Sequence, residues 1–227
     1  MMEKLKRASD WALRLLYPSR AVCMGCDSQS GFPRPWLCEA CRVRLAESWV
    51  GAAKPPEGGL FEGAAYAYRY VGPAGSMVRN LKYRGVWRLA EPMGRHMARA
   101  FETIQPTGAD CVVPVPMHPK RLRQRGFNHA EKLAEQAAAN LRLPVLKALA
   151  RTRNTRQQAR LSGAERRANL DGAFTLDMDV KGRRVVLVDD VCTTGTTAST
   201  CAQTLLDGGA SAVFLLCFAM ARGGEDE

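Results

Sequence analysis

Two spacings of apolar residues follow one another along the 227-residue chain. Near the N-terminus, five apolar residues recur at helical spacing among basic ones and stop before Pro18, which predicts a short basic amphipathic helix. The five are Leu5, Ala8, Ala12, Leu15 and Leu16. Such a stripe favours packing against the rest of the protein, with a membrane-surface role as the alternative. From residue 60 onward, short apolar runs alternate with helical patterns, which is typical of an α/β fold.

The second part of the chain supplies the predicted strands and helices. Strands are expected at residues 64–70, 110–115, 184–188 and 212–218, and helices at residues 86–104, 128–141 and 196–207. Because Gly208 and Gly209 end the last helix just before the last strand, residues 184–218 predict a βαβ unit within a parallel sheet. Turn-forming residues at 54–59 indicate a domain boundary. We expect a helix and cysteine module at 1–54, an α/β domain at 60–222 and an acidic tail at 223–227.

The eight cysteines fall into two groups. One group stands singly in apolar surroundings: Cys111, Cys192, Cys201 and Cys217. The other forms two C-x2-C pairs: Cys23 with Cys26, and Cys38 with Cys41. Two such pairs facing each other give the tetrahedral sulfur site that Zn²⁺ prefers, and full coordination by protein sulfur makes such a zinc ion structural. Two disulfides are the alternative, but four further single cysteines and no secretion signal favour a reducing compartment and therefore zinc.

The charge is concentrated in one segment. The chain has 33 basic and 22 acidic residues, and residues 118–169 hold 13 of the basic and three of the acidic ones. A local cationic block beside an acidic C-terminal third suggests a site for phosphate-bearing ligands. A composition of 46% hydrophobic and 24% charged residues excludes disordered, collagen-like and coiled-coil classes. Since no apolar run could span a membrane and no signal peptide is visible, we expect a cytoplasmic protein.

Residues 185–197 read Val-Val-Leu-Val-Asp-Asp-Val-Cys-Thr-Thr-Gly-Thr-Thr. The pattern predicts a buried strand, two carboxylates at its carboxyl end, a hydroxyl-rich turn and a helix N-terminus, where ligands of α/β sheets and phosphate groups bind. Gly195 allows the backbone to approach a phosphate closely. The hydroxyls belong to Thr193, Thr194, Thr196 and Thr197. Because Asp189 and Asp190 would repel a phosphate, we expect them to bind sugar hydroxyls or Mg²⁺.

A phosphate site beside two carboxylates describes a ribose 5-phosphate group, and the stretch resembles the phosphoribosyl pyrophosphate signature of type I phosphoribosyltransferases. Other segments narrow the resemblance to the ComF family of competence-associated, phosphoribosyltransferase-like proteins. These segments are LKYRG at 81–85, PVPMH at 114–118, RGFNHA at 125–130 and RRANLDGAF at 166–174, together with Arg121, Gln157, Leu161 and the four-cysteine module. The resemblance covers nearly the whole chain.

The resemblance implies a type I phosphoribosyltransferase-like parallel sheet flanked by helices, preceded by a small zinc-binding module. It implies that Asp189 and Asp190 bind the ribose and Mg²⁺ of phosphoribosyl pyrophosphate and that residues 193–197 bind its 5′-phosphate. The loop after residues 110–115 would bind pyrophosphate through Arg121 and Arg125, with a solvated basic loop as the alternative. Thr193 stands where purine-salvage relatives carry an Asp, so no general base is visible and the acceptor stays open.

Two functional classes follow. The first is a phosphoribosyltransferase, or a binder of Mg²⁺-phosphoribosyl pyrophosphate derived from one. The second is a non-catalytic protein that handles single-stranded DNA in DNA uptake or utilisation, which the family implies and the basic segment permits through phosphate neutralisation. The expected partners are phosphoribosyl pyrophosphate, single-stranded DNA or a DNA-uptake protein, and a second copy of the chain in a homodimer. His118 and His129 flank the basic loop and receive no catalytic role.

Overall fold

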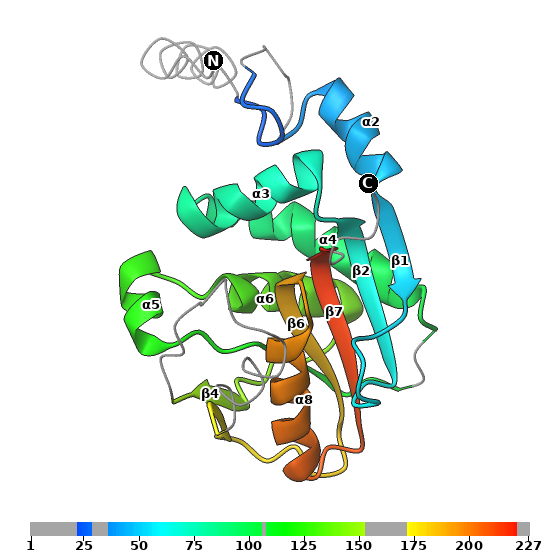
Figure 1. The fold of residues 1–227 in the computed structure, drawn as a ribbon, viewed down its shortest axis with the longest axis vertical. Helices are drawn as coiled ribbons and strands as arrows, with labels where there is room; N and C mark the ends of the chain where they lie inside the picture. The colour runs from blue at the N-terminus through cyan, green and yellow to red at the C-terminus, as the bar shows by residue number, and fades with distance from the viewer. Residues whose placement is uncertain (1–21, 29–35, 106–107, 153–171, 222–227) are drawn as a thin grey trace, which may run out of the picture.

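The computed structural model describes residues 22–28, 36–105, 108–152 and 172–221. Within these residues, one sheet has the strand order β1-β2-β7-β6-β3 (Figure 1). The strands are β1 (Trp49–Ala53), β2 (Gly63–Arg69), β3 (Cys111–Pro114), β6 (Arg184–Cys192) and β7 (Ala212–Met220). Strands β2, β7, β6 and β3 run parallel to one another, and β1 pairs antiparallel with β2 at the edge. The mostly parallel α/β sheet predicted from the sequence is therefore confirmed.

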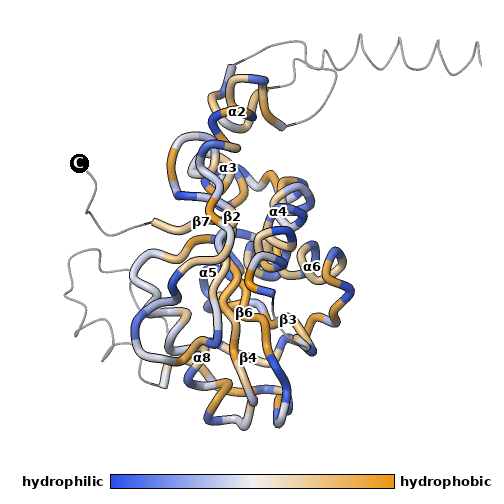
Figure 2. The backbone as a smooth tube through the Cα atoms, turned by 90° about the vertical axis from the view of Figure 1, so that its right-hand side faces the viewer, coloured by the Kyte–Doolittle hydropathy of each residue, from blue (hydrophilic) through white to orange (hydrophobic). Residues whose placement is uncertain are grey.

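Helices cover both faces of this sheet. One face packs against α4 (Ala90–Glu102) and α6 (His129–Leu141), and the other packs against α8 (Thr196–Asp207) (Figures 1 and 2). Because water is excluded on both sides, β7 is buried along nearly its whole length instead of alternating between apolar and polar residues. Helices α4 and α6 approach closely at Gly94, where an added Cβ would lie 2.4 Å from the Cβ of Gln136.

The remaining described elements lie around this sheet. They are α2 (Glu39–Glu47), α3 (Gly72–Tyr83), the short 3-10 helix η1 (Trp87–Leu89), α5 (Pro119–Arg125), β4 (Leu149–Arg151) and β5 (Phe174–Leu176). Helix α2 lies against α3, and the antiparallel β4–β5 pair lies beside α8 (Figure 1). Helix α3 begins with Gly72-Pro73, a pair that in sequence resembles a turn, which is why the periodic pattern did not predict this helix.

Three further elements differ from the sequence-based expectation. Strands β6 and β7 continue past the predicted apolar runs, because Asp189 stays in the ladder opposite Cys217 although its side chain is acidic. The basic segment after β3, expected as a loop, is the helix α5. His118 caps that helix by accepting the backbone N–H of Lys120 at 3.2 Å, and Gly126 ends it in the left-handed conformation. The basic side chains of this segment are therefore presented from a helix.

The proposed division into domains remains a prediction. Strand β1 pairs with β2, so the chain enters the sheet at Trp49, before the boundary expected at residue 54. The helix predicted at the N-terminus and the acidic tail lie outside the described residues. Among the residues that are described, no helix is both long and apolar enough to cross a membrane.

Candidate functional site

Strand β6 carries both acidic residues to the carboxyl edge of the sheet but directs them to opposite faces. Val185 and Leu187 pack in the cluster that contains α8, whereas Val186 and Val188 pack in the cluster that contains α4 and α6. Because side chains alternate along a strand, Asp189 lies on the same face as Val185 and Leu187. Asp190 lies on the opposite face, with Val186 and Val188. Two carboxylates that are adjacent in sequence therefore have different surroundings.

Asp190 is buried, with only 2% of its surface exposed, and is held by two basic side chains. The Lys82 ammonium lies 2.8 Å from Oδ1, and the His129 Nε2 lies 2.8 Å from Oδ2. Burial alone would raise the pKa of this carboxyl, but His129 and Lys82 outweigh that effect and lower its pKa to about 2. Burial likewise opposes the charge on Lys82, yet Asp190 raises the pKa of the ammonium. Lys82 and Asp190 therefore form an ionised pair.

Asp189 is half-buried and has no such cationic partner among its described hydrogen bonds. Its Oδ1 accepts the backbone N–H of Asp190 at 2.8 Å. Burial raises the pKa of Asp189 to about 6, and the neighbouring charge of Asp190 adds to the rise. Asp189 borders a small cavity of about 60 Å³ at the start of α8, so it is the carboxylate available to a ligand there.

The turn predicted to bind phosphate closes around that same cavity. Its lining includes all five predicted loop residues: Thr193, Thr194, Gly195, Thr196 and Thr197. Gly195 is the N-cap of α8 with φ +74°, and an added Cβ would lie 2.5 Å from the Cβ of Pro56. Glycine is therefore required both by the backbone conformation and by the close approach of Pro56. The first backbone N–H groups of α8 have no partner within the helix and, with the helix dipole, favour an anion at this point.

The two predicted pyrophosphate-binding arginines both lie on α5 and are partly buried. The Arg125 guanidinium lies over the Tyr83 ring at 5.1 Å, and its Nη1 is 3.3 Å from Nδ1 of His129. Arg125 is thereby linked through His129 to Asp190. Burial lowers the pKa of the Arg151 guanidinium, and the charge of Arg121 lowers it further, whereas Asp189 raises it. Arg125 is thus connected to the acidic site through His129, whereas Arg121 is related to it only through Arg151.

Lys82 and His129 are the site residues that sequence reasoning did not assign. They come from the end of α3 and the start of α6, 108 and 61 positions before Asp190, and only the fold brings them together. The signals available were the segment LKYRG at 81–85 and the basic block around His129, and neither specifies a partner.

A second group of ligating residues is the four-cysteine cluster. The Sγ atoms of Cys23, Cys26, Cys38 and Cys41 all lie within 4.8 Å of one another. Cys26 Sγ and Cys38 Sγ are 3.8 Å apart. A tetrahedral site with Zn–S bonds of about 2.3 Å requires sulfur atoms about 3.8 Å apart, so the arrangement fits zinc. All four cysteines of this cluster are free in this structure.

Backbone N–H groups orient the sulfur atoms of this cluster. Gly25 and Cys38 donate to Cys23 Sγ at 3.4 and 3.2 Å, and Cys41 donates to Cys38 Sγ at 3.4 Å, where Cys38 caps α2. Hydrogen bonding with Ser28 lowers the pKa of the exposed Cys26 to about 6, whereas burial raises the pKa of Cys41. A bound dication would deprotonate both thiols, which zinc ligation requires.

The four-cysteine module is fixed to α3. Asn80 is buried and donates through Nδ2 to the carbonyl of Met24 at 2.9 Å, and Arg84 forms an ion pair with Asp27 at 2.7 Å. Helix α3 thus contacts the cysteine module through Asn80 and Arg84 and the acidic site through Lys82. One helix connects the two groups of ligating residues.

The fold and the strand-turn-helix site define a phosphoribosyltransferase-like protein, and the phosphoribosyl transferase domain matches residues 122–227. The chain is 33% identical over 190 residues to the DNA utilization protein YhgH of Escherichia coli K12, covering 80% of this chain and 82% of that protein. It is 30% identical over 185 residues to Competence protein F of Haemophilus influenzae, covering 78% and 80%. Competence protein ComFC of Bacillus subtilis is 25% identical over 209 residues, covering 88% and 84%. The chain belongs to the ComF family.

Proposed function

We propose that the carboxyl edge of β6 binds Mg²⁺-phosphoribosyl pyrophosphate. One observation carries this proposal: Asp189, residues 193–197 and the N-terminus of α8 surround the same small cavity. The helix start favours an anion, and the carboxylate beside it accepts hydrogen bonds from hydroxyls. Together they match a ribose 5-phosphate, whose phosphate needs donors and whose hydroxyls need acceptors. Arg121 and Arg125 supply the cations for pyrophosphate from α5.

The two carboxylates differ in how they can act. Asp189 contacts the ribose hydroxyls directly in this proposal. Asp190 reaches the ribose or Mg²⁺ only after Lys82 or His129 releases one of its oxygens, because each oxygen already has a partner at 2.8 Å. Lys82 and His129 therefore hold Asp190 in place and adjust the charge beside the ligand.

The donors also fit a magnesium ion. One ligating atom from each of His129, Asp189 and Asp190 lies within 4.8 Å of the others. Mg²⁺ prefers oxygen donors and is commonly held by one or two carboxylates together with substrate phosphates, so Asp189 and the ligand's own oxygens would hold it. When bound, the ion neutralises the negative charge of the departing pyrophosphate.

Calorimetric titration of phosphoribosyl pyrophosphate, with and without Mg²⁺, tests the site. Asp189→Asn should weaken Mg²⁺-dependent binding by about tenfold or more, since a hydrogen bond to a charged group contributes roughly 1.5–3 kcal/mol. Asp207→Asn, at the exposed far end of α8, is the matched control and should bind like the wild type. Equal affinity in the two variants would remove the assignment.

Turnover is a separate question from binding. If the protein is a phosphoribosyltransferase, a screen of base acceptors should release pyrophosphate in the presence of Mg²⁺, and Asp189→Asn should suppress that release. If it only binds, titration should show Mg²⁺-dependent affinity without pyrophosphate release from any acceptor. We propose that the protein is a phosphoribosyltransferase, with a non-catalytic binder as the alternative.

We further propose that the protein acts in DNA uptake or utilisation. The names of its relatives, DNA utilization protein and competence protein, support this link. The basic side chains near His118 support contact with phosphates. The pKa of His118 is lowered by burial and then by the charges of four basic neighbours: Arg151, Arg121, Arg123 and Lys120. Arg153 and Arg156, part of the same basic segment, lie outside the described residues.

Salt dependence tests direct DNA binding. The affinity for single-stranded DNA should fall with rising salt, with a slope of about 0.7 per neutralised phosphate on logarithmic axes. Arg121→Glu with Arg123→Glu should weaken binding and reduce that slope. Arg79→Glu with Arg95→Glu, at exposed positions of α3 and α4, changes the total charge by the same amount and is the control. A salt-independent affinity, or one equally reduced by the control, would contradict direct phosphate contact by this segment.

A further inference from the structure

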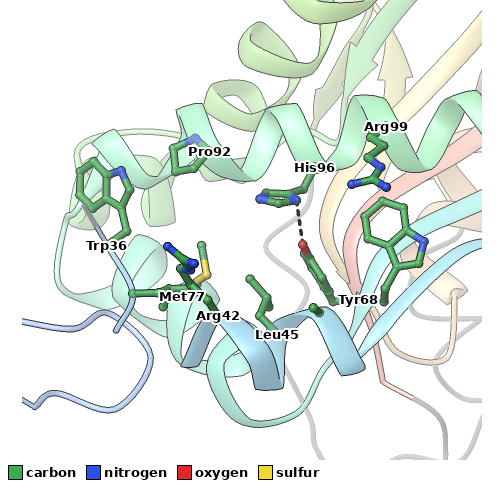
Figure 3. Close-up of a pocket in the computed structure, with 11 residues that line it drawn as sticks. Trp36, Arg42, Leu45, Tyr68, Met77, Pro92, His96 and Arg99 are labelled. Carbon is green, nitrogen blue, oxygen red and sulfur yellow. Dashed lines mark hydrogen bonds between the residues drawn. The ribbon is translucent and has the colours of Figure 1, made fainter. Parts of the chain in front are cut away.

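A second and larger cavity lies between α2 and α4. It has a volume of about 520 Å³, within the range of roughly 300–1,000 Å³ that is typical of small-molecule sites. The side chains of α2 and α4 face each other across it, and Tyr68 of β2 forms part of its wall (Figure 3). No residue that lines it also lines the cavity beside Asp189. It is therefore a separate site, which phosphoribosyl pyrophosphate binding leaves unused.

Aromatic rings provide much of its wall. Trp36, Trp49 and Tyr68 all line the cavity. Trp49 and Tyr68 pack edge to face, with ring centroids 5.5 Å apart, and the Arg99 guanidinium lies over the Trp49 ring at 5.2 Å. Rings held in place in this way can stack with planar aromatic ligands, and the stacking does not depend on which base or substituent the ligand carries. The wall therefore suits a flat ring system.

The charged residues that line the cavity are both cationic. They are Arg42 from α2 and Arg99 from α4, and the described lining contains no carboxylate. Arg42 has an exposed partner, Glu39, at 2.8 Å, which a stronger anion can replace because exposed ion pairs contribute little. The cavity therefore combines stacking surfaces with a demand for negative charge.

His96 adds a polar group that can recognise a ligand. Its Nδ1 lies 2.7 Å from the Tyr68 hydroxyl, and the imidazole projects from α4 toward the cavity (Figure 3). Burial lowers the pKa of His96, and Arg95 and Arg99 lower it further, which favours the neutral ring. With Nδ1 engaged, Nε2 is the nitrogen that can bond to a heteroatom of a ligand.

Segments of the chain itself fit this cavity less well. The N-terminal segment is basic, with Lys4, Lys6, Arg7 and Arg14, and would add positive charge beside Arg42 and Arg99. The acidic residues Glu225, Asp226 and Glu227 have the required charge but no ring to place against the tryptophans. An anion that carries an aromatic ring satisfies both requirements.

We propose that this cavity binds a nucleotide unit, with the base against Trp36 at one end and the phosphate against Arg99 at the other, with His96 between them (Figure 3). A free mononucleotide and one residue of a single strand share this chemistry. Only the second source depends on the proposed role in DNA uptake or utilisation. Base stacking on a protein ring and charge-assisted phosphate contacts are the interactions by which nucleotides are commonly held.

Calorimetric titration of the full chain with dTMP, dAMP and a short oligothymidylate tests the proposal and separates the two sources. Trp36→Ala and Arg99→Ala should each weaken binding by about tenfold, the loss expected when one stacking or charge-assisted contact is removed. Arg95→Ala is the matched control, because Arg95 lies one turn away on α4 and does not line the cavity. Thermal unfolding of each variant checks that the fold is retained.

The outcomes separate this site from the proposed phosphoribosyl site. Mononucleotide binding that Trp36→Ala weakens and Asp189→Asn does not would support a small-molecule site. The same sensitivity seen only with the oligonucleotide would identify the source as a single strand. Binding that Asp189→Asn weakens but Trp36→Ala and Arg99→Ala do not would overturn the proposal, as would no binding by any probe. Neither failure affects the titration with phosphoribosyl pyrophosphate.

Discussion

The cavity beside Asp189 and the cavity between α2 and α4, here named the aromatic cavity, are built in different ways. The first has about 60 Å³, and nearly all its lining comes from residues 189–198, which follow one another along β6, the turn and α8. The second has about 520 Å³ and takes its lining from the cysteine module, β1, β2, α3 and α4. A local backbone shape creates the first cavity, and the docking of the cysteine module onto the sheet domain creates the second.

This difference makes the two cavities separable by experiment. A change that releases α2 should open the aromatic cavity while leaving the turn after β6 intact. A change in that turn should have the reverse effect. Helix α3 contacts both regions, through Asn80 and Arg84 on one side and Lys82 on the other. Substitutions there test whether the regions are independent.

Loss of zinc should have the largest effect and should fall on the aromatic cavity. Cys26 is exposed, so Cys26→Ser removes little packing and acts mainly on the metal. Structural zinc sites contribute roughly 10–16 kcal/mol of apparent binding free energy in small modules, so the variant should lose α2 docking and nucleotide binding. Elemental analysis should find one zinc per chain in the wild type and less in the variant.

Ser28→Ala is the matched control for this change, because Ser28 is an exposed neighbour that contacts Cys26 but is not one of the four cysteines. It should retain zinc and nucleotide affinity. Phosphoribosyl pyrophosphate binding should persist in both variants. If Cys26→Ser abolished that binding as well, the two regions would not be separable.

The second prediction concerns Lys82, which neutralises the buried Asp190. Lys82→Met leaves one oxygen of a buried carboxylate without its cation, and removing one partner of a buried pair costs about 3 kcal/mol or more. The free energy of unfolding, from urea denaturation at pH 7, should fall by about that amount. Arg79→Met, on the exposed side of the same helix, should change it little.

The pH dependence of this pair has a definite sign. The pKa of Asp190 is lowered from 3.8 to about 2 in the folded protein, so the carboxylate stabilises the fold fully above pH 3.8. That stabilisation is lost as the pH falls towards 2. In Lys82→Met the pKa should rise, so the difference in stability between wild type and variant should shrink with falling pH. A difference that stays constant would refute the ion pair as its cause.

How far the sequence predicted these regions follows from how each is built. The turn at 193–197 and helix α8 could be predicted because their residues are consecutive and their spacing is distinctive. The four cysteines were recognisable for the same reason, and their clustering agrees with the zinc prediction. Secondary structure was predicted best where apolar runs were unbroken, as in β7, and less well in β6, where two acidic residues interrupt the run.

The remaining features depend on contacts between distant segments. The pairing of Lys82 and His129 with Asp190 joins α3, α6 and β6, and no local pattern specifies it. The aromatic cavity joins Trp36, Tyr68 and His96, which lie in three separate segments. Sequence periodicity indicates which face of an element is apolar, but it does not indicate which two elements meet.

A third and smaller effect is expected at Gly195. Gly195→Ala places a side chain at φ +74° and a Cβ 2.5 Å from Pro56, so it should destabilise the fold by about 1–3 kcal/mol and weaken phosphoribosyl pyrophosphate binding. Gly182→Ala is a close control, because Gly182 has φ +71° with no atom within 4 Å of an added Cβ. It should show the backbone strain without the loss of binding. Equal binding by both variants would contradict the role of the turn.

The smallest effect is expected at the hydroxyl of Tyr68, which contacts the aromatic cavity but not the turn. Tyr68→Phe keeps the ring packed between Trp49 and Phe218 and removes only the group that lies 2.7 Å from His96 Nδ1. The unfolding free energy should fall by about 1 kcal/mol, the usual net value of one hydrogen bond. Tyr70→Phe, two residues further on, lines neither cavity and serves as the control.

Binding should separate the two roles of the Tyr68 hydroxyl. Without it, His96 is free to rotate and to change tautomer, so nucleotide affinity should fall a few-fold while phosphoribosyl pyrophosphate affinity stays at the wild-type value. If both affinities fell together, the aromatic cavity and the β6 site would be coupled through the sheet. Tyr68 of β2 pairs with Ala219 of β7, and Asp189 of β6 pairs with Cys217, two residues earlier on β7. That result would therefore point to strand β7 as the connection.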